Sequence, residues 1–262
     1  MDRTGVTRSC IICCLPRSGS WLLAEALNNT TVVGQPEEYF RPDHTHLWNQ
    51  RWGLAPQGPY DEYIDAALEY STTDNGVFSA KFHWYQFAWF LDQLRDLQPA
   101  DTVIGDADLI AAALPNPAYI YLTRTDKARQ AISYWRAGRS NVWFVSKDGE
   151  ASDTGPGLPE VDGVERGSEA EPDFARIRWL ERLLVDHDRR WLAYFEANRI
   201  RPLTVLYEHF TANYARTVSD IVRWLGATLP EGFEGLEPGL AKQADELTES
   251  ILERYLAIRD TL

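Results

Sequence analysis

The sequence predicts a single α/β domain with a mostly parallel central sheet flanked by helices. Short apolar runs that are typical of buried strands alternate along the chain with amphipathic helical stretches. The length of 262 residues suits one large domain, and we find no internal repeat or linker that divides residues 1–262. A hydrophobic fraction of 44% is enough for a full core.

The first half of the chain has clear strand and helix signals. Residues 9–15 form a short apolar run that ends at Pro16, which predicts a buried strand. Residues 19–29 repeat apolar side chains at helical intervals and stop at two asparagines, which predicts a helix. We then expect a short strand or turn at residues 30–36, an amphipathic helix at 60–70, and a strand that continues as an aromatic helix at 75–97.

The second half continues the alternation. We expect a strand at residues 117–123, a helix at 126–137, a long helix at 174–198, a strand at 201–210 and a helix at 213–227 that Gly226 ends. Residues 148–173 interrupt this pattern, because they hold many acidic side chains and a single basic one, Arg166. We interpret this segment as a mobile acidic insertion, and we favour a solvated loop over a functional lid.

The charge balance excludes several classes of partner. A formal net charge of −13 and an isoelectric point near 4.8 argue against general affinity for nucleic acid or for an anionic membrane. No apolar stretch is long enough to span a membrane, and the first residues do not resemble a secretory signal. We therefore expect a cytoplasmic protein.

Cys10, Cys13 and Cys14 lie in one apolar segment. Cys10 and Cys13 have the spacing of a metal-binding pair, but no second pair or nearby histidine completes a tetrahedral set. We favour buried thiols that act as small hydrophobes, with Cys13 and Cys14 on opposite faces of a strand, and we expect no metal.

The Pro-Arg-Ser-Gly-Ser loop at residues 16–20 follows the first predicted strand and leads into a helix. Helix N-termini present unpaired N–H groups and favour anions, Arg17 adds a planar cation, and Ser18 and Ser20 add hydroxyls. Gly19 permits close backbone approach. The spacing is not that of a nucleoside triphosphate loop, so the alternatives are another anion site or an ordinary turn with a serine cap.

A second basic position follows another predicted strand. Arg124 comes directly after residues 117–123, and Ser133 lies about two turns into the next helix. Ligands of open α/β sheets bind beyond the carboxyl ends of the strands. Arg124 and the loop at residues 16–20 would then face one crevice, and two separate anion sites indicate a ligand with two phosphate-like groups.

Four motifs resemble those of the trehalose 2-sulfotransferase family of actinobacteria. "LPRSGSWLL", "VGQPEEYF", "LTRTDKARQAISYWRA" and "KQADELTESILERY" match that family in order and spacing from about residue 9 to residue 255. The resemblance implies a sulfotransferase fold that resembles that of phosphate-loop enzymes. It also implies 3'-phosphoadenosine 5'-phosphosulfate as the donor, adenosine 3',5'-bisphosphate as the product, and a homodimer.

The resemblance also implies roles for single residues. The 5'-phosphosulfate would be held by Arg17, Ser18, Gly19, Ser20 and Trp21, the last two mainly through backbone N–H groups. Arg124 and Ser133 would hold the 3'-phosphate, and Lys242 and Gln243 would belong to a C-terminal segment that closes over the nucleotide. Glu38 aligns with the catalytic base of the family.

Two further side chains leave alternatives open. Lys81 is either a second cation near the reacting centre or a surface lysine at the end of a strand. His83 is either the base in place of Glu38, since many sulfotransferases use histidine, or a structural histidine between two aromatic neighbours. We keep Glu38 as the favoured base.

The acceptor pocket is expected to include Gln35, Glu37, Tyr39, Phe40, His83 and Trp84, because sugar faces stack on aromatic rings. More than half of the neighbouring aromatic run is expected in the core. Gln35 stands where trehalose-specific relatives carry an acidic residue. This departure argues against trehalose itself, so we expect the acceptor to be another sugar, a glycolipid or a secondary metabolite. A small-molecule kinase and a non-catalytic nucleotide-binding protein stay as alternatives.

Overall fold

The structure is a computed structural model that describes residues 5–147, 151–152, 171–233, 237–240 and 245–262. Most of the acidic segment at residues 148–173 lies outside the described residues, and so do Lys242 and Gln243.

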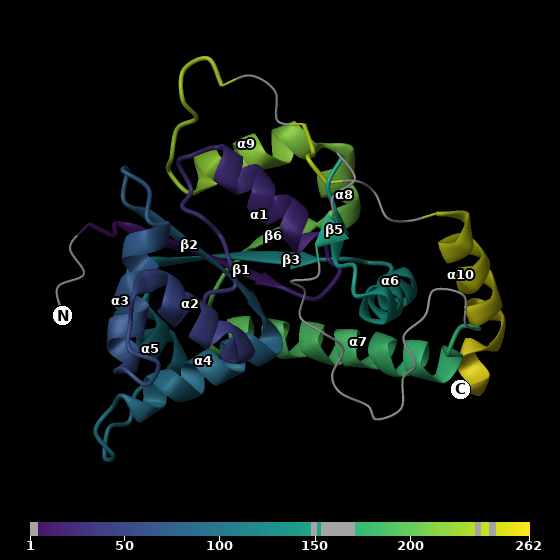
Figure 1. The fold of residues 1–262 in the computed structure, drawn as a ribbon, viewed down its shortest axis with the longest axis horizontal. Coiled ribbons are helices and arrows are strands. Elements are labelled where there is room, and N and C mark those ends of the chain that lie inside the picture. Colours follow the sequence, from purple (N-terminus) through teal and green to yellow (C-terminus); the bar gives the residue numbers. More distant parts are fainter. Residues whose placement is uncertain (1–4, 148–150, 153–170, 234–236, 241–244) are drawn as a thin grey trace.

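The centre of the described chain is a four-stranded sheet. Its strands are β1 (Arg8–Cys14), β2 (Val77–His83), β3 (Pro117–Thr123) and β6 (Leu203–Leu206), and they lie in the order β2-β1-β3-β6. Every pairing between these neighbours is parallel, which confirms the predicted parallel sheet (Figure 1). A separate antiparallel pair joins β4 (Phe144–Val145) to β5 (Ala151–Ser152).

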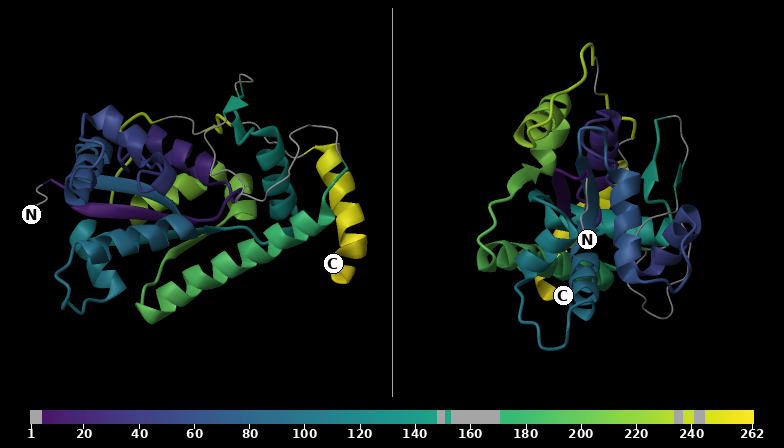
Figure 2. Two further views of the ribbon diagram at one scale, coloured as in Figure 1. Left: turned by 60° about the horizontal axis from the view of Figure 1, so that its bottom comes forward. Right: turned by 90° about the vertical axis from the view of Figure 1, so that its left-hand side faces the viewer.

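Helices cover both faces of this sheet. Figure 1 shows α1 and α9 on one side of the strands and α4, α5 and α7 on the other. Figure 2 shows α7 running along one face of the sheet and reaching α10 near the C-terminus. The helices are α1 (Ser20–Asn29), α2 (Thr45–Trp52), α3 (Tyr60–Ser71), α4 (Trp84–Asp96), α5 (Asp106–Ala113), α6 (Lys127–Ser140), α7 (Phe174–Ala197), α8 (Tyr207–Ala212), α9 (Tyr214–Trp224) and α10 (Glu246–Ile258), with short 3₁₀ turns η1 (Pro42–His44) and η2 (Arg259–Thr261).

Strand β1 separates two buried clusters. Ile11 and Cys13 contribute to the larger one, which packs α3 to α7 and α10, while Ile12 and Cys14 contribute to the smaller one under α1 and α9. Side chains alternate across a strand, so the predicted opposite orientation of Cys13 and Cys14 is confirmed. All three cysteines are buried and unbonded to one another.

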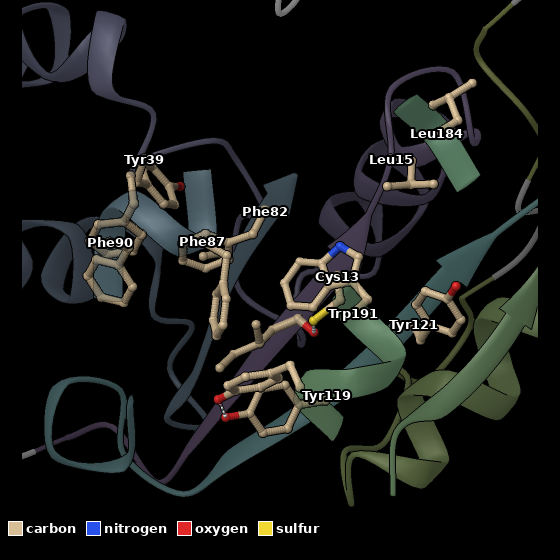
Figure 3. Close-up of a cluster of buried hydrophobic side chains, with 14 of the residues drawn as sticks. Cys13, Leu15, Tyr39, Phe82, Phe87, Phe90, Tyr119, Tyr121, Leu184 and Trp191 are labelled. Atoms are coloured by element: carbon tan, nitrogen blue, oxygen red, sulfur yellow. Dashed lines mark hydrogen bonds between the residues drawn. The ribbon is translucent and has the colours of Figure 1, made fainter. Parts of the chain in front are cut away.

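The larger cluster is rich in aromatic rings. Figure 3 shows Phe82, Phe87 and Phe90 grouped beside the sheet, with Trp191 of α7 over Cys13. The fully buried Trp191 donates its indole N–H to the carbonyl of Cys14 at 3.2 Å. This contact holds the end of β1 against α7, directly before the loop at residues 16–20.

Of the strand or turn expected at residues 30–36, the structure has a turn and bends and no strand, and the next residue, Glu37, forms an isolated bridge to Ala80. One other sequence prediction is wrong in part. The strand expected at 201–210 ends at Leu206, and α8 begins at Tyr207. A tertiary contact supports that change, because the Glu208 carboxylate accepts backbone N–H groups of Thr125 and Asp126 at 3.2 and 3.4 Å.

The segment before Glu38 is held closely against β2. Gly34 has φ +71°, and a Cβ there would lie 2.6 Å from the backbone nitrogen of Ser79. Ser71 accepts the N–H of Gln35 at 3.1 Å and donates to the carbonyl of Ser79 at 2.8 Å. Glycine at position 34 therefore sets the distance between the Glu37–Glu38 segment and the sheet.

We predict that Gly34→Ala destabilises the protein more than Gly53→Ala does. Both glycines have nearly the same φ, +71° and +69°, but no atom lies within 4 Å of a Cβ at Gly53. The left-handed conformation alone costs about 1–2 kcal/mol, and overpacking at Gly34 adds about 1–3 kcal/mol. Urea unfolding measures both variants, and equal losses would contradict the close approach.

Candidate active site

Four chain segments meet at the carboxyl edge of the sheet. The loop at residues 15–19 follows β1, Arg124 follows β3, and Tyr207 follows β6. His83 is the last residue of β2. Parallel strands end at the same edge, so this edge is where an open α/β sheet binds its ligands.

The loop after β1 is held from behind. Ser18 donates its hydroxyl to the carbonyl of Leu15 at 2.7 Å, and Gln130 of α6 donates to the carbonyl of Pro16 at 2.7 Å. Gly19 has φ +85°, and a Cβ there would lie 2.5 Å from the ring of Tyr207. The Ser18 hydroxyl is therefore used within the loop. The backbone N–H groups at the N-terminus of α1 are the donors that the loop still offers to a ligand.

Arg17 and Ser133 are in direct contact. The Nε of Arg17 donates to the hydroxyl of Ser133 at 2.9 Å, and its Nη1 donates to the carbonyl of Trp143. Burial, and then the nearby cations of Arg124 and Arg136, lower the pKa of Arg17 to about 10. The two anion sites expected from the sequence thus form one cationic cluster of Arg17, Arg124 and Arg136.

Arg124 is 11% exposed and lies over the ring of Tyr207, with 4.7 Å between the guanidinium carbon and the ring centroid. Its buried Nε has no hydrogen-bond partner, and the nearest carboxylate oxygen, on Glu208, is 3.8 Å away. Burial lowers the pKa of Arg124. An incompletely paired, desolvated cation of this kind favours an incoming anion.

Arg136 connects the cationic cluster to the C-terminal helix. Its guanidinium pairs with the carboxylate of Asp245 at 2.6 and 2.8 Å, and it also donates to Thr248. Asp245 is the N-cap of α10 and accepts the backbone N–H of Thr248 at 2.9 Å. One contact therefore orients a cation of the site and fixes the start of α10.

The second part of the site is a buried carboxylate. The backbone N–H of Lys81 donates to the carbonyl of Glu37 at 2.9 Å, which places Glu38 beside the end of β2. Glu38 Oε1 is 3.0 Å from Lys81 Nζ and 3.4 Å from His83 Nε2, while Oε2 accepts the amide N–H of Gln86 at 2.5 Å. Glu38 is 5% exposed and lies among partners that are themselves buried.

Electrostatics keep Glu38 ionised. Burial by itself would raise its pKa, but the Lys81 and His83 cations and the hydrogen bonds hold the pKa of Glu38 well below its ordinary value. Burial would lower the pKa of His83, but the Cys14 sulfur and the Glu38 carboxylate outweigh it and raise that pKa to about 9. His83 is therefore an imidazolium at neutral pH.

Lys81 links the carboxylate to the loop after β1. Its Nζ lies 3.3 Å from the ring centroid of Trp21, and its side chain is 0% exposed. The alternative of a surface lysine is therefore wrong. Trp21 in turn packs on Phe144 with centroids 5.1 Å apart.

The residues expected to contact an acceptor are dispersed. Tyr39 and Phe40 are 0% and 1% exposed and pack in the aromatic core, so, contrary to the sequence expectation, they offer an acceptor no free surface. Trp84 is half-buried against Trp191 with centroids 5.1 Å apart. Gln35 is exposed and Glu37 is half-buried, and burial raises the pKa of Glu37.

Sequence reasoning missed two residues of the site. Arg136 lies within one of the four motifs of the resemblance, so the sequence shows a basic residue there. The sequence does not show that Arg136 pairs with Asp245 at the start of α10. Gln86 had no such signal. It lies three residues after His83 in an aromatic run, and only the fold brings its amide to Glu38.

The structure shows no metal centre and no membrane span in its described part. Within the residues described, no group of three or more His, Cys, Asp or Glu side chains could hold a metal ion. None of the described helices is both long and apolar enough to cross a membrane.

The family model described as Stf0 sulphotransferase matches residues 9–257. The chain belongs to this family. Trehalose 2-sulfotransferase of Mycolicibacterium smegmatis is 27% identical over 91% of both chains, and that of Mycobacterium tuberculosis is 26% identical over 95% of both. The resemblance drawn from the motifs is confirmed, and membership of a sulfotransferase family displaces the kinase alternative.

Solved structures of sulfotransferases resemble the fold more distantly. The sulfotransferase domain of the Synechococcus PCC 7002 olefin synthase has a TM-score of 0.47 at 13% identity and covers 98% of this chain and 97% of its own. A sulfotransferase from Alicyclobacillus acidocaldarius has a TM-score of 0.45 at 15% identity, over 95% and 91%. Both scores are low, so the family assignment depends on the sequence match.

We predict that the contacts of His83 with Cys14 and Glu38, which raise the pKa of its imidazole, make stability fall at alkaline pH. A pKa raised from 6.5 to about 9 contributes stability that is complete below pH 6.5 and is lost as the pH rises through about 9. The full contribution is at most about 3 kcal/mol. Urea unfolding of the wild type and of His83→Asn at pH 6 and pH 9.5 tests this, and a stability difference that does not change with pH would contradict it.

Proposed function

We propose that this protein transfers a sulfuryl group from 3'-phosphoadenosine 5'-phosphosulfate to a hydroxyl of a sugar, a glycolipid or a secondary metabolite, with Glu38 as the general base. The observation that carries the proposal is the Glu38–Lys81 pair, 3.0 Å apart, whose lysine lies against Trp21 of the α1 N-terminus. A proton acceptor and an anion-binding loop therefore share one site.

The residues present fit such a donor. Burial and the nearby cations of Arg124 and Arg136 lower the pKa of Arg17, and Arg124 Nε is buried without a hydrogen-bond partner. Anionic oxygens would relieve both conditions. When bound, the donor supplies an activated sulfuryl group and the leaving nucleotide. The proposed nucleotide-binding residues also include Ser18, Gly19, Ser20, Trp21 and Ser133, with Lys242 and Gln243 outside the described chain.

Glu38 and Lys81 would have different roles at the reacting centre, one as the proton acceptor and the other as a stabilising cation. Glu38 is ionised and accepts the proton of the acceptor hydroxyl as its oxygen attacks sulfur. Lys81, released from part of its pairing as that proton arrives, is placed to stabilise negative charge on the transferred group. Sulfuryl oxygens carry less charge than phosphoryl oxygens, so these cations and backbone amides can act without a bridging metal.

The acceptor is proposed from the relatives and from the site together. Both curated relatives are named for sulfation of trehalose. Gln35, Glu37 and Trp84 are the remaining candidates for contacts with a sugar, since they keep exposed or half-exposed side chains. A homodimer and a cytoplasmic location stay expectations of the same proposal. A non-catalytic nucleotide-binding protein would keep the cationic cluster and lose any dependence on Glu38.

We predict that adenosine 3',5'-bisphosphate binds more tightly than AMP, and that Arg124→Ala removes most of this preference. A charge-assisted contact to the second phosphate is worth about 1.5–3 kcal/mol, or roughly 10- to 150-fold in affinity. Isothermal titration calorimetry measures both nucleotides. Arg129→Ala is the matched control, because Arg129 lies on the same strand-to-helix segment but is paired with Asp126 and Glu249.

Equal affinities of the wild type for the two nucleotides would contradict the donor assignment. A loss in Arg129→Ala as large as in Arg124→Ala would instead indicate a general effect of net charge.

We predict that Glu38→Gln lowers kcat by about 10²- to 10⁴-fold while binding of adenosine 3',5'-bisphosphate changes little. The amide keeps the shape of the side chain and removes the proton acceptor. Transfer of labelled sulfate to trehalose, and to acceptors found in a hydroxyl-compound screen, measures kcat. Glu37→Gln is the control and is expected to act mainly on the KM of the acceptor.

If Glu38→Gln keeps near-full turnover and His83→Ala abolishes it, His83 is the base. If no acceptor is sulfated while the nucleotide preference holds, the non-catalytic alternative replaces the proposal.

A further inference from the structure

Within the described chain, Gln86 is the one neutral residue that donates a hydrogen bond to the Glu38 carboxylate. It is the third residue of α4 and is 0% exposed. Its amide nitrogen donates to Glu38 Oε2 at 2.5 Å and to the hydroxyl of Tyr85 at 3.1 Å, and its Oε1 accepts the backbone N–H of His83 at 2.8 Å. The amide oxygen and both amide N–H groups of Gln86 are therefore hydrogen-bonded, within the site or at the start of α4.

These contacts fix the amide of Gln86 before any ligand binds. The bond from the His83 backbone N–H determines which end of the amide faces Glu38, because Oε1 is used there and only the nitrogen is left for the carboxylate. Tyr85 takes the second N–H. A buried amide with its groups paired in this way has one orientation, and it imposes that orientation on Glu38.

The two oxygens of Glu38 are consequently unlike. Oε1 lies between two cations, at 3.0 Å from Lys81 Nζ and 3.4 Å from His83 Nε2. Oε2 accepts a hydrogen bond from one neutral amide. Oε1 is buried between these cations, whereas Oε2 accepts one hydrogen bond and a carboxylate oxygen can accept two, so we assign the acceptor hydroxyl to Oε2.

We infer that Gln86 is a positioning residue, which holds the Glu38 carboxylate against Lys81 and His83 and leaves Oε2 to receive the proton of the acceptor. This inference rests on the proposed role of Glu38 as the base. Gln86 touches neither donor nor acceptor and acts through the carboxylate.

Several ionisable groups surround the pair and bear on any titration of it. His83 has the Cys14 sulfur of β1 at 3.5 Å and His187 of α7 within electrostatic range. The groups that interact with Glu38 besides His83 are Glu37, Arg41, His44, Lys81, Tyr85 and Tyr134. Gln86→Met leaves all of these side chains in the chain and adds no charge, so a change in titration in that variant reports the carboxylate's position.

The test compares Gln86→Met with Gln93→Met. Gln93 lies two turns further along α4 and, within the described chain, has no hydrogen bond to Glu38, so the control makes the same chemical change in the same helix. Gln86→Glu is the second variant, because it keeps an acceptor for the His83 N–H and loses the donor to Glu38. Glu38→Gln defines the effect of losing the carboxylate entirely.

The first measurement needs no acceptor and no activity. Nuclear magnetic resonance of the histidine side chains, with His83 assigned from His83→Asn, gives the pKa of that imidazole. Loss of a neighbouring carboxylate in Glu38→Gln lowers the pKa by about 1 to 3 units. We expect Gln86→Met to produce at least half of that decrease and Gln93→Met to produce none.

The second measurement is the pH dependence of sulfuryl transfer. We expect Gln86→Met to lower kcat by about 10- to 100-fold. Loss of the amide donor raises the pKa of Glu38, so the acid limb of the profile moves to higher pH in Gln86→Met and further in Gln86→Glu. Binding of adenosine 3',5'-bisphosphate stays as in the wild type.

The inference is overturned if His83 has the same pKa in Gln86→Met as in Gln93→Met. If Gln86→Met fails to fold, the inference is overturned when the acid limb of the pH–rate profile of Gln86→Glu stays where it is in the wild type. If the imidazole pKa falls as expected and no transfer is found, the positioning role stands and the proposed function fails.

Discussion

The ion pair between Glu38 and Lys81 is the interaction on which the arrangement of the site depends. It lies in the interior, where an unpaired charge would be costly, so each partner requires the other. Lys81 belongs to β2, and Glu38 belongs to a loop that follows α1 and is held to the sheet by one backbone bond and the close approach of Gly34. A contact between two short segments thereby joins the proposed base to the sheet edge where the anion-binding loop also ends.

The charged side chains of the site form two groups with different partners. Trp21 contacts both Lys81 and Phe144, while Arg17 donates to Ser133 and to the carbonyl of Trp143. The cations of Arg17, Arg124 and Arg136 thus gather on the side of α6, and Glu38 keeps its own pair of cations on β2. In a chain of net charge −13 this local grouping, rather than the overall field, would attract the proposed anionic donor.

Helices on both sides of the sheet hold this edge from behind. Trp191 of α7 bonds to the end of β1, Gln130 of α6 bonds to the loop that follows, and Gln86 of α4 bonds to Glu38. Arg136 continues the same support to α10 through Asp245. Groups that must be held rigidly for transfer chemistry are therefore fixed by elements that also form the core, which is what a preorganised site requires.

The sequence by itself determined the fold class, the order of the main strands and helices, and the family, because strand periodicity and four spaced motifs are properties of neighbouring residues. It also identified Arg17, Arg124, Ser133 and Glu38 as candidates. Tertiary structure alone decided that Tyr39 and Phe40 are core, that the short segment Tyr207–Ala212 is helical, and that Lys81 is buried on Trp21. It alone brought Gln86 to Glu38 and Arg17 to Ser133. Such contacts join residues far apart in the chain, and no local pattern of side chains encodes the distance between them.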